Sequence, residues 1–462
     1  MLPHPSASTA AATLRSRSAP RAAPALLAAL ALSALTLAAC AQPADTPTPP
    51  PPAYAFTGAT LWDGTGAPAI PNAVILVREG RIEAVGSADD VEIPSDATRQ
   101  DLSGHWIIPG LINAHGHVGQ ALGLEQGATA HTRENIEAQL ALYARYGVTT
   151  VVSLGEPGYE GVAVRDAQAS PEATAGLDHA RLFVAGIVMN PGTPEEAHAQ
   201  AAERAEEGVD WAKIRVDDGL GQGQAMSRPT YAAAISGSRA EGLPLTAHMV
   251  YLEDAKGLAR EGAAVLGHSV RDEPVDQELI DLMLAGNICL HPTLTREVST
   301  FIYADRPGFF DDPFFLRDAD PSVLAELETP ERQARFSGTA ADWYRAQLPT
   351  ATRNMTALHD AGVRIAFGTD SGPPARFQGY FEHMELEMMQ DAGMSPEDIL
   401  RSATGVAADC MGLEDVGTLV ERAWADFVVV RADPLADITN LRQIEEVRIA
   451  GNAVPGARFE GR

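Results

Sequence analysis

Between residues 106 and 414 the sequence alternates short apolar, strand-like runs with longer amphipathic, helix-like runs, and this alternation limits the fold more than any other feature. A long series of βα units predicts an α/β fold with a parallel sheet, and eight units are typical of a (β/α)8 TIM barrel. A doubly wound sheet would share the alternation. We expect the barrel at residues 106–414. The strand candidates are WIIPGLINAHGHV, VTTVVSLG, RLFVAGIVM, VDWAKIRVDD, LPLTAHMV, AAVLGHSV, NICLHPTL and VRIAFGTDSG.

Both ends of this region carry short β-type runs separated by turns. We expect residues 55–105 and 415–460 to form one small, discontinuous β-sandwich domain, because two separate β appendages would each have too few strands for a core. A long insertion, from Thr295 to about Leu348, follows the seventh strand candidate. It would lie at the mouth of the barrel, either as a lid or as an inert surface excursion.

The N-terminal 40 residues have the order of a secretory signal, with basic residues first, an apolar run next and small residues last. The end of this segment, Leu37-Ala38-Ala39-Cys40, resembles the bacterial lipobox. We expect a signal peptide at residues 1–40, a lipid anchor at Cys40 and a proline-rich linker at residues 41–54. This predicts a periplasm-facing lipoprotein of the bacterial cell envelope, anchored in the outer membrane; a cleaved signal with a chance cysteine is the alternative.

The formal net charge of −28 argues against nucleic acid as a partner, because phosphate binding depends on clustered lysine and arginine. We expect a small-molecule or peptide substrate instead, and the oligomeric state, including a homo-oligomer, is left open. Besides Cys40 the chain has only Cys289 and Cys410, which do not form a disulfide framework pattern, and the sequence leaves their pairing open.

Histidines stand at the ends of several strand candidates. His115 and His117 are two residues apart on one strand, so both side chains point to the same face. His248, His268 and Asp370 end the fifth, sixth and eighth strand candidates. Barrel enzymes have their active sites at this end of the strands, and imidazole and carboxylate are preferred ligands of Zn²⁺. The pattern therefore predicts a divalent metal site.

Lys213 is one of only two lysines in the chain and lies in the strand candidate WAKIRVDD. The period of a strand turns Lys213 and Arg215 toward the barrel interior. A charged ammonium beside divalent metal ions would be strongly disfavoured, whereas a carbamate formed with CO2 is an anionic ligand able to bridge two ions. A structural lysine paired with Asp217 or Asp218 is the alternative.

The string IIPGLINAHGHV, with YGVTTVVSLG, LTAHMV, VLGHSV, HPTL, AFGTDSG and EHMELEMMQDAGMSPEDILRSATGVAADC, resembles the amidohydrolase superfamily, and within it the imidazolonepropionase-like group that includes metal-dependent dipeptidases of the prolidase type. The resemblance implies two Zn²⁺ ions bridged by a carboxylated Lys213. It assigns His115 and His117 to the buried ion, His248 and His268 to the more exposed ion, and Asp370 to metal binding and catalytic proton transfer.

We therefore expect a metal-dependent hydrolase that cleaves C–N bonds in amides or peptides through a metal-activated hydroxide. A hydrolase of cyclic amides, lactones or organophosphate esters, and a binding lipoprotein without turnover, are the alternatives. His291 and Arg215 are the candidate substrate-binding residues. Arg376 is a candidate for either a substrate carboxylate or an internal salt bridge, and His383 is expected to have a supporting role.

Overall fold

The computed structural model describes residues 51–155, 158–170, 173–174, 176–221 and 223–461. The predicted signal peptide, Cys40 and residues 41–50 of the predicted linker lie outside this part of the chain. Among the described helices, none combines the length and the apolar character needed to cross a bilayer.

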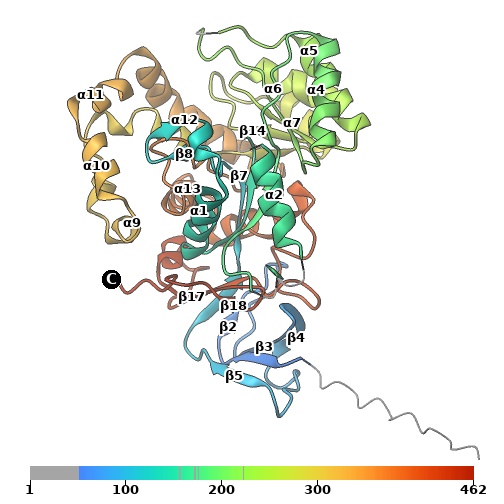
Figure 1. Ribbon diagram of the computed structural model, residues 1–462, viewed down its shortest axis with the longest axis vertical. Coiled ribbons are helices and arrows are strands. Elements are labelled where there is room, and N and C mark those ends of the chain that lie inside the picture. The colour runs from blue at the N-terminus through green and yellow to red at the C-terminus, as the bar shows by residue number, and fades with distance from the viewer. Residues whose placement is uncertain (1–50, 156–157, 171–172, 175, 222, 462) are drawn as a thin grey trace, which may run out of the picture. The chain divides into compact units, whose positions relative to one another are not determined.

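Parallel strands form the centre of the described chain (Figure 1). Three of them pair in the order β11-β10-β7, and four pair in the order β12-β13-β14-β15. Isolated parallel bridges link Met189 to Ile214, Leu290 to Ile365 and Gly116 to Ser371, so residues 365–371 contact both β15 and β7. The strands are β7 (Leu111–Gly116), β10 (Val148–Ser153), β11 (Arg181–Val184), β12 (Ala212–Arg215), β13 (Leu245–His248), β14 (Val265–Gly267) and β15 (Cys289–His291).

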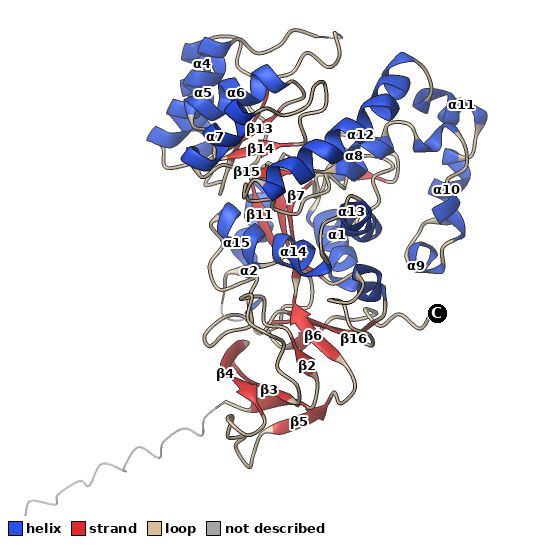
Figure 2. Ribbon diagram, turned by 180° about the vertical axis from the view of Figure 1, so that it is seen from behind, coloured by secondary structure: helices blue, strands red, loops and turns tan. Residues whose placement is uncertain are grey.

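Helices follow these strands in sequence and cover them from outside (Figure 2). Local signals set their ends: the Thr193 hydroxyl accepts from the Glu196 amide before the helix that starts at Pro194, and Gly262 ends another helix in the left-handed conformation. These helices are α1 (Arg133–Arg145), α2 (Tyr159–Gln168), α4 (Pro194–Glu206), α5 (Arg228–Ala240), α6 (Leu252–Glu261), α7 (Gln277–Gly286), α13 (Tyr380–Asp391), α14 (Pro396–Ser402) and α15 (Gly405–Met411).

The first strand candidate, WIIPGLINAHGHV, is wrong as a single strand, because Gly110 divides it. Residues before Gly110 form β6 (Trp106–Pro109), which pairs antiparallel with β16 (Phe427–Val430), and residues after it form β7 of the parallel sheet. A Cβ atom at Gly110 would lie 2.0 Å from the Thr149 hydroxyl oxygen, so the chain passes from one sheet to the other at a point with no room for a side chain.

Two further sheets lie outside the parallel strands, and the five-stranded one combines strands from both ends of the described chain. The four-stranded sheet has the order β4-β3-β1-β5, and the five-stranded sheet has the order β18-β17-β16-β6-β2. Phe56 of the first sheet and Phe427 of the second meet edge to face, with ring centroids 5.0 Å apart, within one shared apolar core. The strands not yet given are β1 (Ala53–Thr57), β2 (Thr60–Leu61), β3 (Ala73–Arg78), β4 (Arg81–Ser87), β5 (Thr98–Asp101), β17 (Ile444–Ile449) and β18 (Asn452–Ala453), with the small pair β8 (Ala121–Leu122) and β9 (Glu125–Gln126) after β7.

The insertion after β15 is helical. Its expected end near Leu348 falls inside a helix, because α12 continues through Pro349 to Asp360. Aromatic side chains of the insertion, including Phe309 and Phe315, pack on Phe377 and its neighbours near the start of α13. The helices are α8 (Leu294–Ser299), α9 (Pro313–Leu316), α10 (Pro321–Leu327), α11 (Pro330–Gln333) and α12 (Thr339–Asp360).

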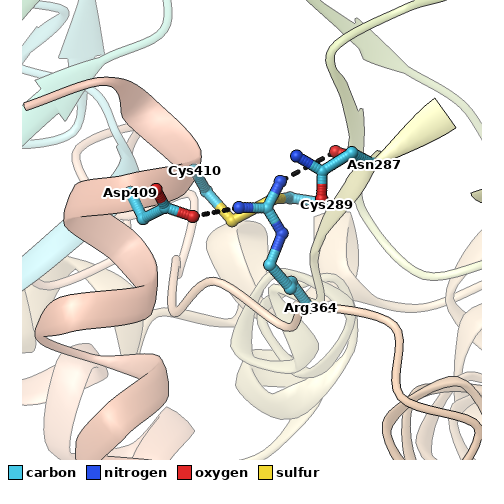
Figure 3. The surroundings of a disulfide bond; sticks show 5 residues. All are labelled: Asn287, Cys289, Arg364, Asp409 and Cys410. Carbon is cyan, nitrogen blue, oxygen red and sulfur yellow. Dashed lines mark hydrogen bonds and ion pairs between the residues drawn. A yellow bond between two sulfur atoms is a disulfide. The ribbon is translucent and has the colours of Figure 1, made fainter. Parts of the chain in front are cut away.

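Cys289 and Cys410 form a disulfide, which answers the question that the sequence left open (Figure 3). The bond joins β15 to α15, with Cα atoms 6.1 Å apart. Beside it, the Arg364 guanidinium donates to the Asn287 carbonyl at 2.8 Å and pairs with Asp409. The disulfide therefore lies two residues from His291 and ties a central strand to the helix that follows the eighth strand-like segment.

Candidate metal centre

The chain brings the expected ligand residues together at the carboxyl ends of the central strands. His115 belongs to β7 and His248 ends β13, while His268 directly follows β14 and Asp370 directly precedes the bridge residue Ser371. Parallel pairing places His248 opposite Gly267, next to His268. The site is thus assembled from segments that are far apart in the sequence but adjacent in the sheets.

The donor atoms face one another at metal-binding distances. One set of ligand atoms, from His115, His268 and Asp370, lies within 4.8 Å of one another, and all three residues are buried. His117 Nε2 and His115 Nε2 lie 2.7 and 3.6 Å from Asp370 Oδ1. His248 Nδ1 lies 2.7 Å from His268 Nε2. This arrangement of imidazoles and one carboxylate fits a divalent metal ion.

Burial keeps three of the imidazoles, those of His115, His248 and His268, in the neutral form that metal binding requires. It lowers the pKa of His248 to about 3 and the pKa values of His115 and His268 well below the usual range. Burial alone would raise the pKa of Asp370. The Arg376 guanidinium and His117 have the larger, opposite effect and bring the pKa well below its usual value, so the carboxyl group is ionised. Neutral imidazoles and an ionised carboxylate are the protonation states of metal ligands.

Lys213 lies inside this cluster. Its ammonium nitrogen is 2.9 Å from His115 Nε2, and the residue is 3% exposed. Burial lowers the pKa of Lys213 to about 7. Asp217 pairs with Arg215 and lies 3.1 Å from His248 Nε2, and Asp218 accepts from the Tyr251 hydroxyl, so neither carboxylate takes the structural pairing role considered from the sequence.

Three residues at the site have positive φ angles although none is glycine. They are His268 at 76°, Asp370 at 58° and Thr293 at 48°. Hydrogen bonds hold two of them: the Asp370 amide donates to the His115 carbonyl at 2.6 Å, and the His268 amide donates to the His291 carbonyl at 2.9 Å. Such backbone conformations cost free energy, and they persist where surrounding contacts hold the residue in place. They are common at functional sites.

Two buried glutamates of α13 support the strand ends. Glu382 accepts from Asn113, Thr369 and Ser371 at 2.8, 2.6 and 2.6 Å. Glu385 accepts from the amides that follow Thr293, as described below. Sequence reasoning missed both residues, although two acidic residues three apart on a core-facing helix are a signal of buried, hydrogen-bonded carboxylates.

Of the candidate substrate-binding residues, the two arginines line a cavity at the site and His291 does not. Arg215 lines a cavity of about 260 Å³ at the site but is already paired with Asp217 at 2.9 Å. Arg376 lines the same cavity and pairs with Asp370, which makes the internal salt bridge its observed role. The described residues that line the cavity are His115, His117, Gln120, Gln126, Leu154, Val188, Lys213, Arg215, His248, Arg296, Asp370, Pro373 and Arg376.

Neither His291 nor His383 is among these lining residues. His291 is fully buried with its ring centroid 5.5 Å from that of His115, and neither ring nitrogen has a hydrogen-bond partner among the described residues. His383 Nε2 lies 2.8 Å from the Tyr146 carbonyl oxygen, away from the metal ligands. Arg296 also lines the cavity, but the sequence did not predict this. The only signal in the sequence is its position at the start of the insertion.

Comparison with known proteins identifies the family of the chain. The model of the amidohydrolase family matches residues 106–454, so the chain belongs to the amidohydrolase family. A dihydroorotase of Anaeromyxobacter dehalogenans is 29% identical over 77% of this chain and 78% of its own length. An imidazolonepropionase of Streptomyces avermitilis is 26% identical over 79% of this chain and 81% of its own length.

Solved structures show the same fold. The structure of a Xaa-Pro dipeptidase with bound methionine superposes with a TM-score of 0.70 at 20% identity, over 87% of this chain and 99% of the dipeptidase. The resemblance expected from the sequence is therefore confirmed, as is the prediction of an amidohydrolase-family enzyme.

Proposed function

We propose that this protein is a metal-dependent hydrolase that cleaves C–N bonds in small amides or peptides. The observation that carries the proposal is the convergence of four imidazoles, one carboxylate and one lysine on the central strands, with all but His248 buried. Placing an amine, a carboxylate and imidazoles together in the protein interior costs free energy, so they would not stabilise a structural core. We also propose that the two parallel sheets and residues 365–371 close into a (β/α)8 barrel, and that the two antiparallel-rich sheets form the β-sandwich expected from the sequence.

We propose that the donor set holds two ions, Zn²⁺, with His115 and His117 as ligands of one and His248 and His268 as ligands of the other. When bound, such ions polarise a carbonyl group and lower the pKa of a water molecule to near 7. Asp370 would take the proton from the attacking water and deliver it to the leaving amine, because its ionised carboxylate faces both His115 and His117.

Lys213 is the proposed bridging ligand. Carbamate formation needs a neutral amine, and burial lowers the pKa of Lys213 to about 7, so a large fraction of the amine is neutral at physiological pH. The amine nitrogen forms a bond to the carbon of CO2 and releases one proton, which leaves an anionic carbamate. That group would replace an unfavourable buried cation with two oxygen ligands.

We propose that the protein acts in the bacterial periplasm as a lipoprotein anchored through Cys40 to the outer membrane. The Cys289–Cys410 disulfide supports this proposal, since disulfides form and persist in oxidising compartments such as the periplasm. Labelling with radioactive palmitate would test the anchor, because a Cys40→Ala variant would lose the label.

A hydrolysis screen tests the activity. Protein reconstituted with Zn²⁺ or Mn²⁺ would be assayed on dipeptides, N-acyl amino acids, cyclic amides, lactones and an aryl phosphotriester, with Asp370→Asn as the inactive control. We expect turnover of at least one linear amide. Turnover of the lactone or phosphotriester alone would contradict the assignment to C–N bonds. The absence of any turnover, together with less than one bound metal equivalent, would contradict the proposal that the protein is a metal-dependent enzyme.

A further inference from the structure

Arg296 brings a buried guanidinium to the candidate metal centre. It lies on α8, at the start of the helical insertion, and is 7% exposed. It lines the same cavity of about 260 Å³ as His115, Lys213 and Asp370. The insertion therefore contributes a charged side chain to the site, and does not only surround it.

The walls of this cavity have an excess of positive charge. Its lining residues include three arginines but only one carboxylate, that of Asp370. Two of the arginines have full partners, since Arg215 forms two hydrogen bonds to Asp217 and Arg376 pairs with Asp370. Arg296 is the cavity arginine whose partner carboxylate, that of Glu297, also pairs with a second arginine.

The compensation of Arg296 is shared with a second arginine. Glu297 Oε2 lies 3.2 Å from Arg296 Nη1 and 3.2 Å from Nε of the fully buried Arg271. One carboxylate thus serves two guanidinium groups. Arg296 Nε has no hydrogen-bond partner among the described residues. A buried charged group with unsatisfied donors is costly unless a ligand completes its hydrogen bonds.

The guanidinium is also held in place. Its central carbon lies 4.7 Å from the centre of the Tyr344 ring, in cation–π contact, and Glu297 is itself fixed by Arg271. A fixed, partly unpaired guanidinium is suited to a carboxylate, because the planar fork of donors matches the two oxygens. Preorganisation reduces the entropy lost on binding.

We propose that Arg296 is a specificity-determining residue that binds a carboxylate of the substrate, so that the enzyme selects acidic amides, such as N-acyl amino acids with a free carboxyl group, over their neutral counterparts. This inference rests on the proposed hydrolase function. It assigns the insertion a role in substrate selection, which the sequence left open between a lid and an inert excursion.

Matched substrates test the kinetic part. An N-acyl amino acid and its carboxamide would be compared in the wild-type protein, in Arg296→Met and in Arg296→Lys, with the exposed Arg345→Met of α12 as control. We expect Arg296→Met to lower kcat/KM for the acid by roughly 10- to 100-fold, mainly through KM, and to change the carboxamide by less than about 3-fold. The value of kcat/KM for the acid in Arg296→Lys should lie between those of the wild type and Arg296→Met, because lysine keeps the positive charge but lacks the planar pair of N–H donors. Equal losses on both substrates would overturn the proposal.

A binding measurement separates this inference from the hydrolase function. Isothermal titration would compare glutarate with glutaramide, neither of which needs to be cleaved, on the wild-type protein and on both Arg296 variants. Tighter binding of glutarate to the wild type, weakened at least about 10-fold in Arg296→Met, would support the carboxylate site even if no hydrolysis were found. Equal binding of glutarate and glutaramide, or unchanged glutarate binding in a folded Arg296→Lys and Arg296→Met pair, would overturn it.

Discussion

Replacing Glu385 with Gln removes a buried carboxylate that anchors the first turn of the insertion. Glu385 accepts hydrogen bonds from the Leu294 amide, the Thr295 amide and the Thr295 hydroxyl, each at 2.7 Å. The Thr293 hydroxyl beside them lies 2.6 Å from His268 Nδ1, so the same turn orients a metal ligand. The substitution preserves the shape of the side chain and one carbonyl acceptor, removes the titrating group, and turns the other acceptor into an amide donor that faces a backbone N–H.

The expected effect depends on pH. Burial raises the pKa of Glu385 from its usual 4.5 to about 7 in the folded protein, despite the three hydrogen bonds that oppose the shift. The folded protein therefore binds more protons than the unfolded chain between about pH 4.5 and 7, and the contribution of this group to stability is lost as pH rises through that window. A shift of this size corresponds to about 3 kcal/mol. Because Gln does not titrate, the free energy of unfolding of the wild type minus that of Glu385→Gln should fall by about 3 kcal/mol between pH 4.5 and 8.

Urea unfolding, followed by circular dichroism at several pH values, measures this difference. The exposed Glu241→Gln variant is the control, and its difference from the wild type should stay within about 0.5 kcal/mol at every pH. A loss of stability in Glu385→Gln that is the same at all pH values would refute the reasoning, because it would mean that the buried carboxyl group keeps an ordinary pKa.

Other substitutions test the site and its support. Asp370→Asn should lower kcat on any cleaved amide by roughly 10²- to 10⁴-fold, because it removes the proposed proton carrier; a fall of less than about 3-fold would assign that role elsewhere. Replacing Cys289 and Cys410 together with Ser should lower the free energy of unfolding by about 2–5 kcal/mol, measured by urea unfolding against the oxidised wild type. Dithiothreitol should reproduce most of that loss in the wild type and none in the double variant.

The cluster of candidate metal ligands could be predicted from the sequence, because strand geometry determines where these side chains lie. Two residues on one strand share a face when they are two apart, and parallel strands in neighbouring βα units end at the same edge. These rules were enough to expect that His115, His248, His268 and Asp370 would meet, and they do.

The remaining features depend on contacts that no local pattern encodes. The division of the first strand at Gly110 follows from the position of Thr149 on another strand, and the disulfide follows from the packing of α15 against β15. The contributions of Arg296 and Glu385 depend on how the insertion folds back over the site. Sequence periodicity predicts which face a residue occupies, but not which distant segment covers that face.

The metal content of Lys213→Ala tests the two-metal hydrolase most directly. Elemental analysis after reconstitution with Zn²⁺ would compare the wild type, Lys213→Ala and Lys256→Ala, which replaces the only other lysine, a residue of α6 paired with Glu253 and Asp276. We predict two equivalents of Zn²⁺ in the wild type and in Lys256→Ala, and one or none in Lys213→Ala. Two equivalents and full activity in Lys213→Ala would contradict the bridging role, and less than one equivalent in the wild type would contradict the metal centre itself.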